Sequence, residues 1–260
     1  MNLENTPIYF AGSGNVAWHL ANAFMAANLP VKGIWSRNKE TAFQLSEKTN
    51  IPFINEELFF SQSGIFILAV NDGAIENLAS RFTNKNIVLI HTAGSVPLNI
   101  LNAFTIHSGV FYSLQTFSKN RSIDFSGMPV FIESSDSAIE DLLSLWTEKL
   151  KAEKHICNSE QRIKIHIAAV FASNFTNHML SQAEIWLKEN NLSKSILKPL
   201  ILETVWKALE QGAINSQTGP AVRQDNSTIE KHLQTLEYAP DLKNLYSFVT
   251  ESIIRFYTKK

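Results

Sequence analysis

The fold of this chain is decided by the stretch Pro7-Ile8-Tyr9-Phe10-Ala11-Gly12-Ser13-Gly14-Asn15-Val16-Ala17. A short apolar run, typical of a buried strand, ends there in the pattern Gly-x-Gly-x-x-Ala. Gly12 suits a tight turn, Gly14 lets backbone approach a pyrophosphate, and the small Ala17 lets a helix pack on its strand. The pattern predicts a dinucleotide cradle, and the alternative is a plain glycine turn between a strand and a helix.

The segment after the glycines favours the first interpretation. Apolar residues recur there at helical spacing, at Val16, Leu20, Ala23, Phe24 and Ala27. The free N–H groups of the first helical turn would therefore point at the phosphates of a bound dinucleotide. A second strand is predicted over residues 31–35, as expected for a strand–helix–strand unit.

The composition of the 260 residues limits the classes of protein to which the chain can belong. There are 23 Lys plus Arg against 24 Asp plus Glu, without a long positive run, so we expect neither a nucleic-acid nor a membrane partner. Cys157 is the only cysteine, which excludes an internal disulfide and a cysteine-rich zinc site, and no metal is predicted. No signal-peptide pattern and no apolar run of roughly 18 residues is present, so we expect a soluble cytoplasmic protein.

The strand predicted over residues 31–35 is followed by Ser36-Arg37-Asn38, where the choice between the two nicotinamide dinucleotides is made. A free ribose 2′-hydroxyl is usually bound by Asp or Glu, and no acid occupies this place. The Ser36 hydroxyl and the Arg37 guanidinium suit a 2′-phosphate, so the segment predicts NADP(H) rather than NAD(H). The alternative is an arginine in a solvated turn.

Two further apolar runs, residues 64–70 and 86–90, predict buried strands of a parallel sheet. Asn71 follows the first run, and His91 and Thr92 follow the second, at the sheet edge where ligands bind. Asn71 suits a simple turn equally well, and His91 suits a packing or capping role. The residues predicted to contact the cofactor are Gly12, Ser13, Gly14, Asn15, Val16, Ser36, Arg37, Val70, Asn71, His91 and Thr92.

Residues 1–157 are therefore predicted to form a Rossmann domain, an α/β fold with a doubly wound, mostly parallel sheet. Residues 158–260 show only helical patterns and are predicted to form an all-helical domain. Within the first domain, Tyr112 and Gln115 lie in a stretch that mixes polar with apolar residues. Such a stretch suits a ligand wall as well as a half-buried strand, and both residues are candidate substrate contacts.

The first helix of the second domain, predicted over about residues 161–190, carries polar residues within an apolar sequence. His166, Ser173 and Asn177 are nearly aligned along it, and Asn174 lies within a quarter turn of that line. Buried polar groups need partners or a ligand, so His166 and Asn174 are candidate catalytic residues. Ser173 and Asn177 are candidate substrate contacts, and the alternative is hydrogen bonding to neighbouring helices or across a dimer interface.

A turn near the end of the chain carries one more candidate. Arg223 follows a Gly-Pro pair and could hold an anionic group of the substrate or pair with Asp225. Ser227 and Glu230 have the spacing of a capping box for the next helix. Arg223 is therefore predicted as a substrate contact, with a salt bridge as the alternative.

These motifs together resemble a known family, the Rossmann-like proteins that carry a helical C-terminal domain of unknown function and are often catalogued as NADP oxidoreductases. The likeness spans almost the whole chain and rests on Gly12-Ser13-Gly14-Asn15-Val16-Ala17, Leu114-Gln115-Thr116-Phe117, His166-Ile167-Ala168-Ala169-Val170-Phe171-Ala172-Ser173-Asn174 and Thr218-Gly219-Pro220-Ala221-Val222-Arg223. The family is similar in layout to pyrroline-5-carboxylate reductase, ketopantoate reductase and 6-phosphogluconate dehydrogenase. The resemblance implies a helical domain of the 6-phosphogluconate dehydrogenase-like type, which often dimerises, and we expect a homodimer.

The resemblance also implies hydride transfer between NADP(H) and a small C=O or C=N substrate bound between the domains. Members of the hydroxyacid branch carry a lysine and, four residues on, an asparagine on the first long helix of the second domain. Here His166 is followed by Val170, and Asn174 comes eight residues on, so the reaction stays unassigned. The alternatives are a catalytically silent NADP-binding sensor that signals through a helical dimer, and a methyltransferase or other nucleotide user.

Overall fold

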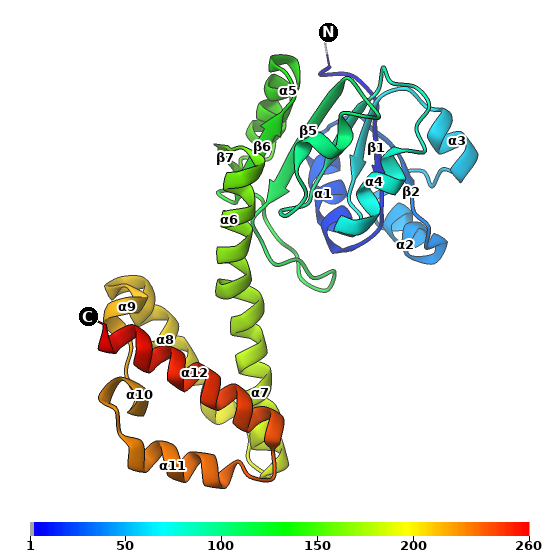
Figure 1. The fold of residues 1–260 in the computed structure, drawn as a ribbon. Coiled ribbons are helices and arrows are strands. Elements are labelled where there is room, and N and C mark those ends of the chain that lie inside the picture. Colours follow the sequence, from blue (N-terminus) through cyan, green and yellow to red (C-terminus); the bar gives the residue numbers. More distant parts are fainter. Residues whose placement is uncertain (1–2, 260) are drawn as a thin grey trace. The chain divides into compact units, whose positions relative to one another are not determined.

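The computed structural model describes residues 3–259 and divides the chain into two compact units (Figure 1). The first unit ends at Asn174 and the second begins at Phe175. The domain boundary expected after residue 157 stays a prediction. The helix after that residue packs into the first unit through Arg162, which is fully buried there.

The first unit is built around a seven-stranded sheet in the order β2-β1-β3-β4-β5-β6-β7 (Figure 1). Its strands are β1 (Ile8–Ala11), β2 (Val31–Trp35), β3 (Ile65–Leu68), β4 (Val88–His91), β5 (His107–Ser113), β6 (Pro129–Ser134) and β7 (Glu153–Ile156). The strands from β2 to β5 pair in parallel, β6 is antiparallel to β5, and β7 is parallel to β6. The predicted Rossmann α/β class with a mostly parallel sheet is confirmed.

Helices cover both faces of this sheet, which is why its central strands are apolar throughout. The helices and single turns of the first unit are α1 (Asn15–Ala26), α2 (Lys39–Thr49), α3 (Glu56–Ser61), η1 (Asp72–Ala74), α4 (Ile75–Ala79), η2 (Leu98–Leu101), α5 (Ser137–Lys149) and α6 (Ser159–Ala169). On one face Phe24 of α1 packs between Phe10 and Trp146, with ring centroids 5.7 and 4.9 Å away. On the other face Phe59 of α3 packs edge-on against Phe66 at 5.3 Å.

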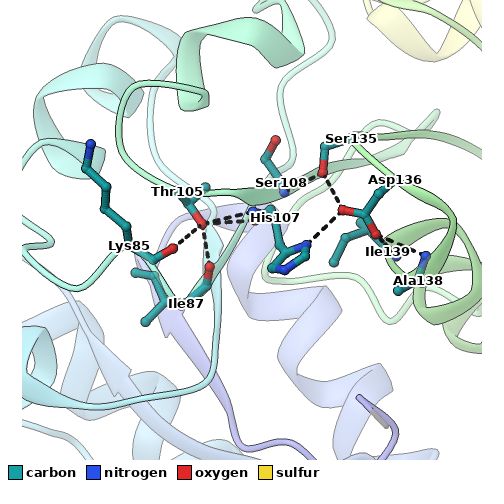
Figure 2. Close-up of polar contacts among 9 residues, drawn as sticks. All are labelled: Lys85, Ile87, Thr105, His107, Ser108, Ser135, Asp136, Ala138 and Ile139. Carbon is teal, nitrogen blue, oxygen red and sulfur yellow. Dashed lines mark hydrogen bonds and ion pairs between the residues drawn. The ribbon is translucent and has the colours of Figure 1, made fainter. Parts of the chain in front are cut away.

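A polar network ties the start of β5 to the start of α5 (Figure 2). The Asp136 carboxylate accepts hydrogen bonds from the backbone N–H groups of Ala138 and Ile139, and so caps α5. Its other oxygen lies 2.9 Å from Nδ1 of His107 and accepts from the Ser135 hydroxyl. Partial burial raises the pKa of Asp136, but the hydrogen bonds from His107, Ser135 and Ile139 outweigh it and the pKa is lowered.

The second unit contains helices and no strand among the residues that the structure describes. After the π-helix η3 (Val170–Phe175), which continues α6, come α7 (Thr176–Glu189), η4 (Lys194–Leu197), α8 (Lys198–Gln211), α9 (Ala213–Ser216), α10 (Pro220–Arg223), α11 (Asn226–Thr235) and α12 (Pro240–Thr258). The helical C-terminal region is thus confirmed. Within residues 3–259, none of these helices combines the length and the apolar character needed to span a bilayer.

The predicted capping box of α11 is wrong. The structure starts α11 at Asn226, one residue before Ser227, and Asp225 is its cap. The Asp225 carboxylate accepts hydrogen bonds from the backbone N–H of Thr228, at 3.1 Å, and from the Thr228 hydroxyl, at 2.8 Å. Aspartate and serine are equally good helix caps, so the spacing of Ser227 and Glu230 could not show whether Asp225 or Ser227 caps the helix.

Candidate cofactor and substrate site

The glycine loop after β1 is shaped by two different demands on backbone. Gly12 has a φ of 120°, and a Cβ added to it would lie 2.2 Å from the carbonyl oxygen of Ala69. Any larger residue would therefore clash with backbone at this turn. A Cβ added to Gly14 would meet nothing within 4 Å, so this glycine borders open space. Gly14 also precedes α1 and offers it no side-chain cap, which leaves the first N–H groups of the helix available to an anion.

This loop lines a cavity of about 380 Å³, here called the nucleotide cavity. Ten of the eleven predicted cofactor contacts line it, namely Gly12, Ser13, Gly14, Asn15, Val16, Ser36, Arg37, Val70, Asn71 and Thr92. The Ser13 hydroxyl donates to Ser36 Oγ at 2.9 Å and lies 2.6 Å from Thr41 Oγ1, so three hydroxyls meet at the end of β2. Beside them the Arg37 side chain is exposed.

A second guanidinium lines the nucleotide cavity and was missed from the sequence. Arg81 pairs with Glu56, and its guanidinium carbon lies 4.0 Å from the ring centre of Phe60 and 5.3 Å from that of Trp35. The aromatic rings hold the guanidinium in place by cation–π contact. No local pattern pointed to it, because it reaches the cavity from the loop after α4 and not from the glycine motif.

His91 does not line the nucleotide cavity. It is fully buried at the end of β4, where its Nδ1 accepts a hydrogen bond from the Ala93 N–H at 3.2 Å. Burial, and secondly the positive charge of Arg162, lower the pKa of His91 to about 3, so its ring is neutral at physiological pH. This placement favours the packing role over cofactor contact, because neighbouring residues of a strand face opposite sides and Thr92 takes the cavity side.

A second cavity of about 740 Å³ adjoins the nucleotide cavity. Both cavities are lined by Asn15, Val16, Val70 and Thr92, so they share a wall at the carboxyl ends of the parallel strands. All residues around this second cavity belong to the first unit. The predicted substrate and catalytic residues that line it are Tyr112, Gln115, His166, Ser173 and Asn174.

Tyr112 and His166 form a hydrogen-bonded pair in the second cavity. The Tyr112 hydroxyl lies 2.9 Å from Nδ1 of His166, whose Nε2 has no hydrogen-bond partner among residues 3–259. Burial, and secondly the charge of Asp72, raise the pKa of Tyr112, while Arg162 opposes them. The phenol therefore stays protonated at neutral pH and is able to donate to the imidazole.

A glycine makes room for this pair. A Cβ added to Gly94 would lie 2.6 Å from Nδ1 of His166 and 3.0 Å from the Tyr112 ring. Gly94 was not identified from the sequence, because the contact depends on how α6 packs against the loop after β4.

A buried ion pair attaches helix α6 to strand β6 of the sheet. Arg162 is 0% exposed, pairs with Glu133 of β6, and donates to the carbonyl oxygen of Val96. One turn further on, α6 presents His166 to the cavity. The helix then widens into the π-helix η3, which brings Ser173 and Asn174 to the same cavity. π-helical turns occur frequently at functional sites.

Asp72 lines the second cavity although it was not among the residues predicted from the sequence. It follows β3 directly after the predicted contact Asn71, lines the second cavity, and accepts a hydrogen bond from the Ser95 hydroxyl. The end of β3 indicates both Asn71 and Asp72 as polar residues at the ligand-binding edge of the sheet. The conformation of the turn η1 decides that Asn71 lines the nucleotide cavity and Asp72 the second cavity.

Two predicted substrate residues lie in the second unit. Asn177 is exposed on α7, and Arg223 is exposed at the end of α10. Neither lines the second cavity. The charge of Arg223 contributes to lowering the pKa of Asp225, after the hydrogen bonds from Thr228, but the two side chains form no salt bridge within residues 3–259. The roles of Asn177 and Arg223 stay predictions.

Several solved structures are similar to this chain. The crystal structure of a putative NADP oxidoreductase from Bacteroides fragilis is 35% identical at a TM-score of 0.90, covering 98% of this chain and 100% of that chain. A protein from Thermotoga maritima is 17% identical at a TM-score of 0.69, covering 97% and 98%. A pyrroline-5-carboxylate reductase from Coxiella burnetii is 16% identical at a TM-score of 0.56, covering 98% of both chains. The last two similarities show the fold alone.

Two further comparisons concern sequence. The family model described as a domain of unknown function, DUF2520, matches residues 128–253. No curated protein matches the chain. Because 35% identity extends over nearly all of both chains, this chain belongs to the same family as the Bacteroides fragilis protein, which has a Rossmann-like fold with a helical C-terminal region.

Proposed function

We propose that this protein is an NADP(H)-dependent oxidoreductase that transfers a hydride to a small C=O or C=N compound in the second cavity. The observation that carries the proposal is the wall shared by the two cavities at Asn15, Val16, Val70 and Thr92. A dinucleotide seated on the glycine loop would extend along this wall, so that its reactive ring borders the second cavity. The cytoplasmic location expected from the sequence belongs to the same proposal.

The residues of the nucleotide cavity fit NADP(H). The open space beside Gly14 and the uncapped start of α1 suit a pyrophosphate. The Ser36 hydroxyl and the exposed Arg37 guanidinium suit a 2′-phosphate, and the printed description of the Bacteroides fragilis relative also names NADP. Bound NADPH would supply the hydride.

We infer that His166 is the proton donor of the reaction. A phenol that donates from Tyr112 to Nδ1 leaves the proton of the neutral imidazole on Nε2. This Nε2–H is suited to bind the oxygen or nitrogen of the substrate and to supply the proton that this atom takes up as the product forms. Tyr112 orients the His166 ring, and its phenol proton can move to Nδ1 when Nε2 gives up its own proton.

The other polar groups of the cavity would orient the substrate. Asn174 and Ser173 of η3 offer an amide and a hydroxyl from one side, and Gln115 offers an amide from the loop after β5. The substrate contacts expected of Asn177 and Arg223, which belong to the second unit, are not used in this proposal.

We also propose that the helical unit forms a homodimer. Helix α8 exposes a stripe of large apolar side chains at helical spacing, Leu202, Val205, Trp206 and Leu209, which are 50, 48, 61 and 74% exposed. Exposed apolar stripes of this kind mark association surfaces. Light scattering during size exclusion should give a dimer mass, and Trp206→Glu should give a monomer.

The function is tested by binding and by turnover. NADPH at a hundred times its Kd should stabilise the protein by about 2.7 kcal/mol, more than NADH or S-adenosylmethionine at the same concentration. NADPH oxidation is then screened against aldehydes, keto acids and imines, and each hit is repeated with His166→Ala and Asn174→Ala. NADPH binding with no turnover of any compound would favour the alternative, a catalytically silent NADP-binding sensor.

A further inference from the structure

The second cavity carries an uneven set of charges. Among the described residues 3–259, no lysine or arginine lines it, and Asp72 is the one carboxylate that does. The remaining titratable groups around it are the Tyr112 phenol and the His166 imidazole. A ligand in this cavity therefore meets one full negative charge and no permanent positive charge.

The negative charge of Asp72 influences the Tyr112–His166 pair, where the reaction is proposed to take place. Its charge contributes to raising the pKa of Tyr112, so its field reaches the phenol that touches His166. The Ser95 hydroxyl donates to one carboxylate oxygen, which fixes the side chain at the cavity wall. The carboxylate forms no salt bridge within residues 3–259, so its charge is not cancelled there by a protein cation.

The cation that acts on the same phenol already has a carboxylate partner. Arg162 also influences Tyr112, but its guanidinium is fully buried beneath α6. It is engaged by the Glu133 carboxylate and the Val96 carbonyl, and it does not line the cavity. An anionic substrate would find no partner in Arg162.

We propose that the second cavity selects a cationic nitrogen substrate, a protonated imine without a carboxylate beside the reacting carbon, and that Asp72 is the specificity-determining residue. The inference rests on the proposed function and narrows it. Opposite charges attract more strongly in a partly solvated cavity than in bulk water, so one carboxylate is enough to set a preference. The same field repels a keto acid or an imino acid through its carboxylate.

The reaction balances without a further reagent. The hydride adds to the carbon of the protonated C=N group, the π-electron pair of that bond moves to nitrogen, and NADPH becomes NADP⁺. The product is a neutral amine, which then takes a proton from His166 Nε2–H or from water. The loss of the substrate's positive charge weakens its attraction to Asp72 until the amine is protonated.

This proposal opposes the expectation built on Arg223, in which a cation of the second unit holds an anionic substrate group. The two expectations predict opposite orders for a matched pair of substrates, pyrroline and pyrroline-5-carboxylate, which differ by one carboxylate. With NADPH, the kcat/KM of pyrroline should be about tenfold higher or more, which corresponds to ~1.4 kcal/mol.

Asp72→Asn removes the charge and keeps an acceptor for the Ser95 hydroxyl. It should reduce the preference for pyrroline to within about threefold, mainly by lowering its kcat/KM. The matched control is Glu76→Gln, which removes one negative charge from exposed α4 at a residue that lines neither cavity. This control should keep the wild-type preference, and thermal unfolding of both variants checks that they are folded.

Binding separates this inference from the proposed function. Calorimetry of the NADP⁺ complex should give a Kd for pyrrolidine about tenfold lower than that for proline, and Asp72→Asn should remove the difference. If no compound is reduced but this order of binding holds, the reductase proposal fails and the charge selection stands. A preference for the carboxylate compound, an unchanged preference in Asp72→Asn, or binding of neither amine would overturn the inference.

Discussion

The two adjoining cavities of the first unit are built in different ways. The nucleotide cavity is lined by one continuous loop, from Gly12 to Asn15, together with the ends of neighbouring strands and the segment around α4 that carries Arg81. The second cavity is lined by side chains that come from distant parts of the chain, including Asp72, Tyr112 and His166. The first is a site for an anion bound by N–H groups, whereas the second is a site whose chemistry depends on single side chains.

Because the two cavities are built differently, substitutions should affect cofactor binding and turnover separately. A change in the backbone of the glycine loop should abolish cofactor binding, and with it turnover. A change at a side chain of the second cavity should lower turnover and leave cofactor binding nearly intact.

The largest effect is expected for Gly12→Ala. The added Cβ would overlap the Ala69 carbonyl oxygen at a φ of 120°, so the loop must move away from its phosphate-binding shape. We expect the affinity for NADPH to fall by about 100-fold or more, measured by calorimetry. Gly73→Ala is the control, because a Cβ there meets nothing within 4 Å. Equal affinities for the two variants would contradict the role given to this turn.

Gly94→Ala should act on the second cavity instead. The added Cβ would occupy the place of the His166 ring, which must then turn away from Tyr112. We expect kcat to fall by about 30-fold, while the Kd for NADPH changes by less than about threefold. A parallel loss of NADPH affinity would show that the two cavities are not separable in this way.

Arg37→Ala should sharpen the assignment of the nucleotide cavity. Loss of the guanidinium should raise the Kd for NADPH about tenfold and leave the Kd for NADH within about twofold, since only NADPH carries the 2′-phosphate. Arg81→Ala is the informative comparison, because this guanidinium lines the same cavity over Trp35 and Phe60. Equal loss of both cofactors in Arg37→Ala would contradict the NADP assignment of this residue.

The smallest effect is expected for Asp136→Asn, which touches neither cavity. Because the pKa of Asp136 is lowered in the folded state, its contribution is complete above the ordinary value of 3.8 and is lost as pH falls through the lowered value. The variant keeps a side-chain cap for α5 but loses the carboxylate that faces His107, so it should lose less than about 1 kcal/mol of unfolding free energy at neutral pH, and the difference should shrink in acid. Urea titrations over a pH series measure this, with NADPH affinity expected to stay unchanged.

The sequence predicted the nucleotide cavity better than the second cavity for a physical reason. Gly12, Gly14 and the strand before them are adjacent, and each has a local demand that a short motif records. His91 shows the limit of a local motif. Successive side chains of a strand point to opposite faces of the sheet, and the His91 ring lies on the face that is buried in the core.

The parts that the sequence did not indicate depend on packing between distant segments. Gly94 matters only because α6 brings His166 against it, and Arg81 reaches the nucleotide cavity only by lying over Phe60. His166 itself was singled out from its helix, but its partner Tyr112 lies 54 residues earlier. Contacts of this kind follow from tertiary structure and leave no local pattern.

In our proposal the two cavities are the two halves of one reductase site. Transfer of deuterium from NADPH labelled at its transferable hydrogen to the C=N carbon of pyrroline tests it most directly, by mass spectrometry of the pyrrolidine formed. We predict one deuterium per product molecule with the wild-type protein. Tight NADPH binding with no deuterium in any product would contradict the account.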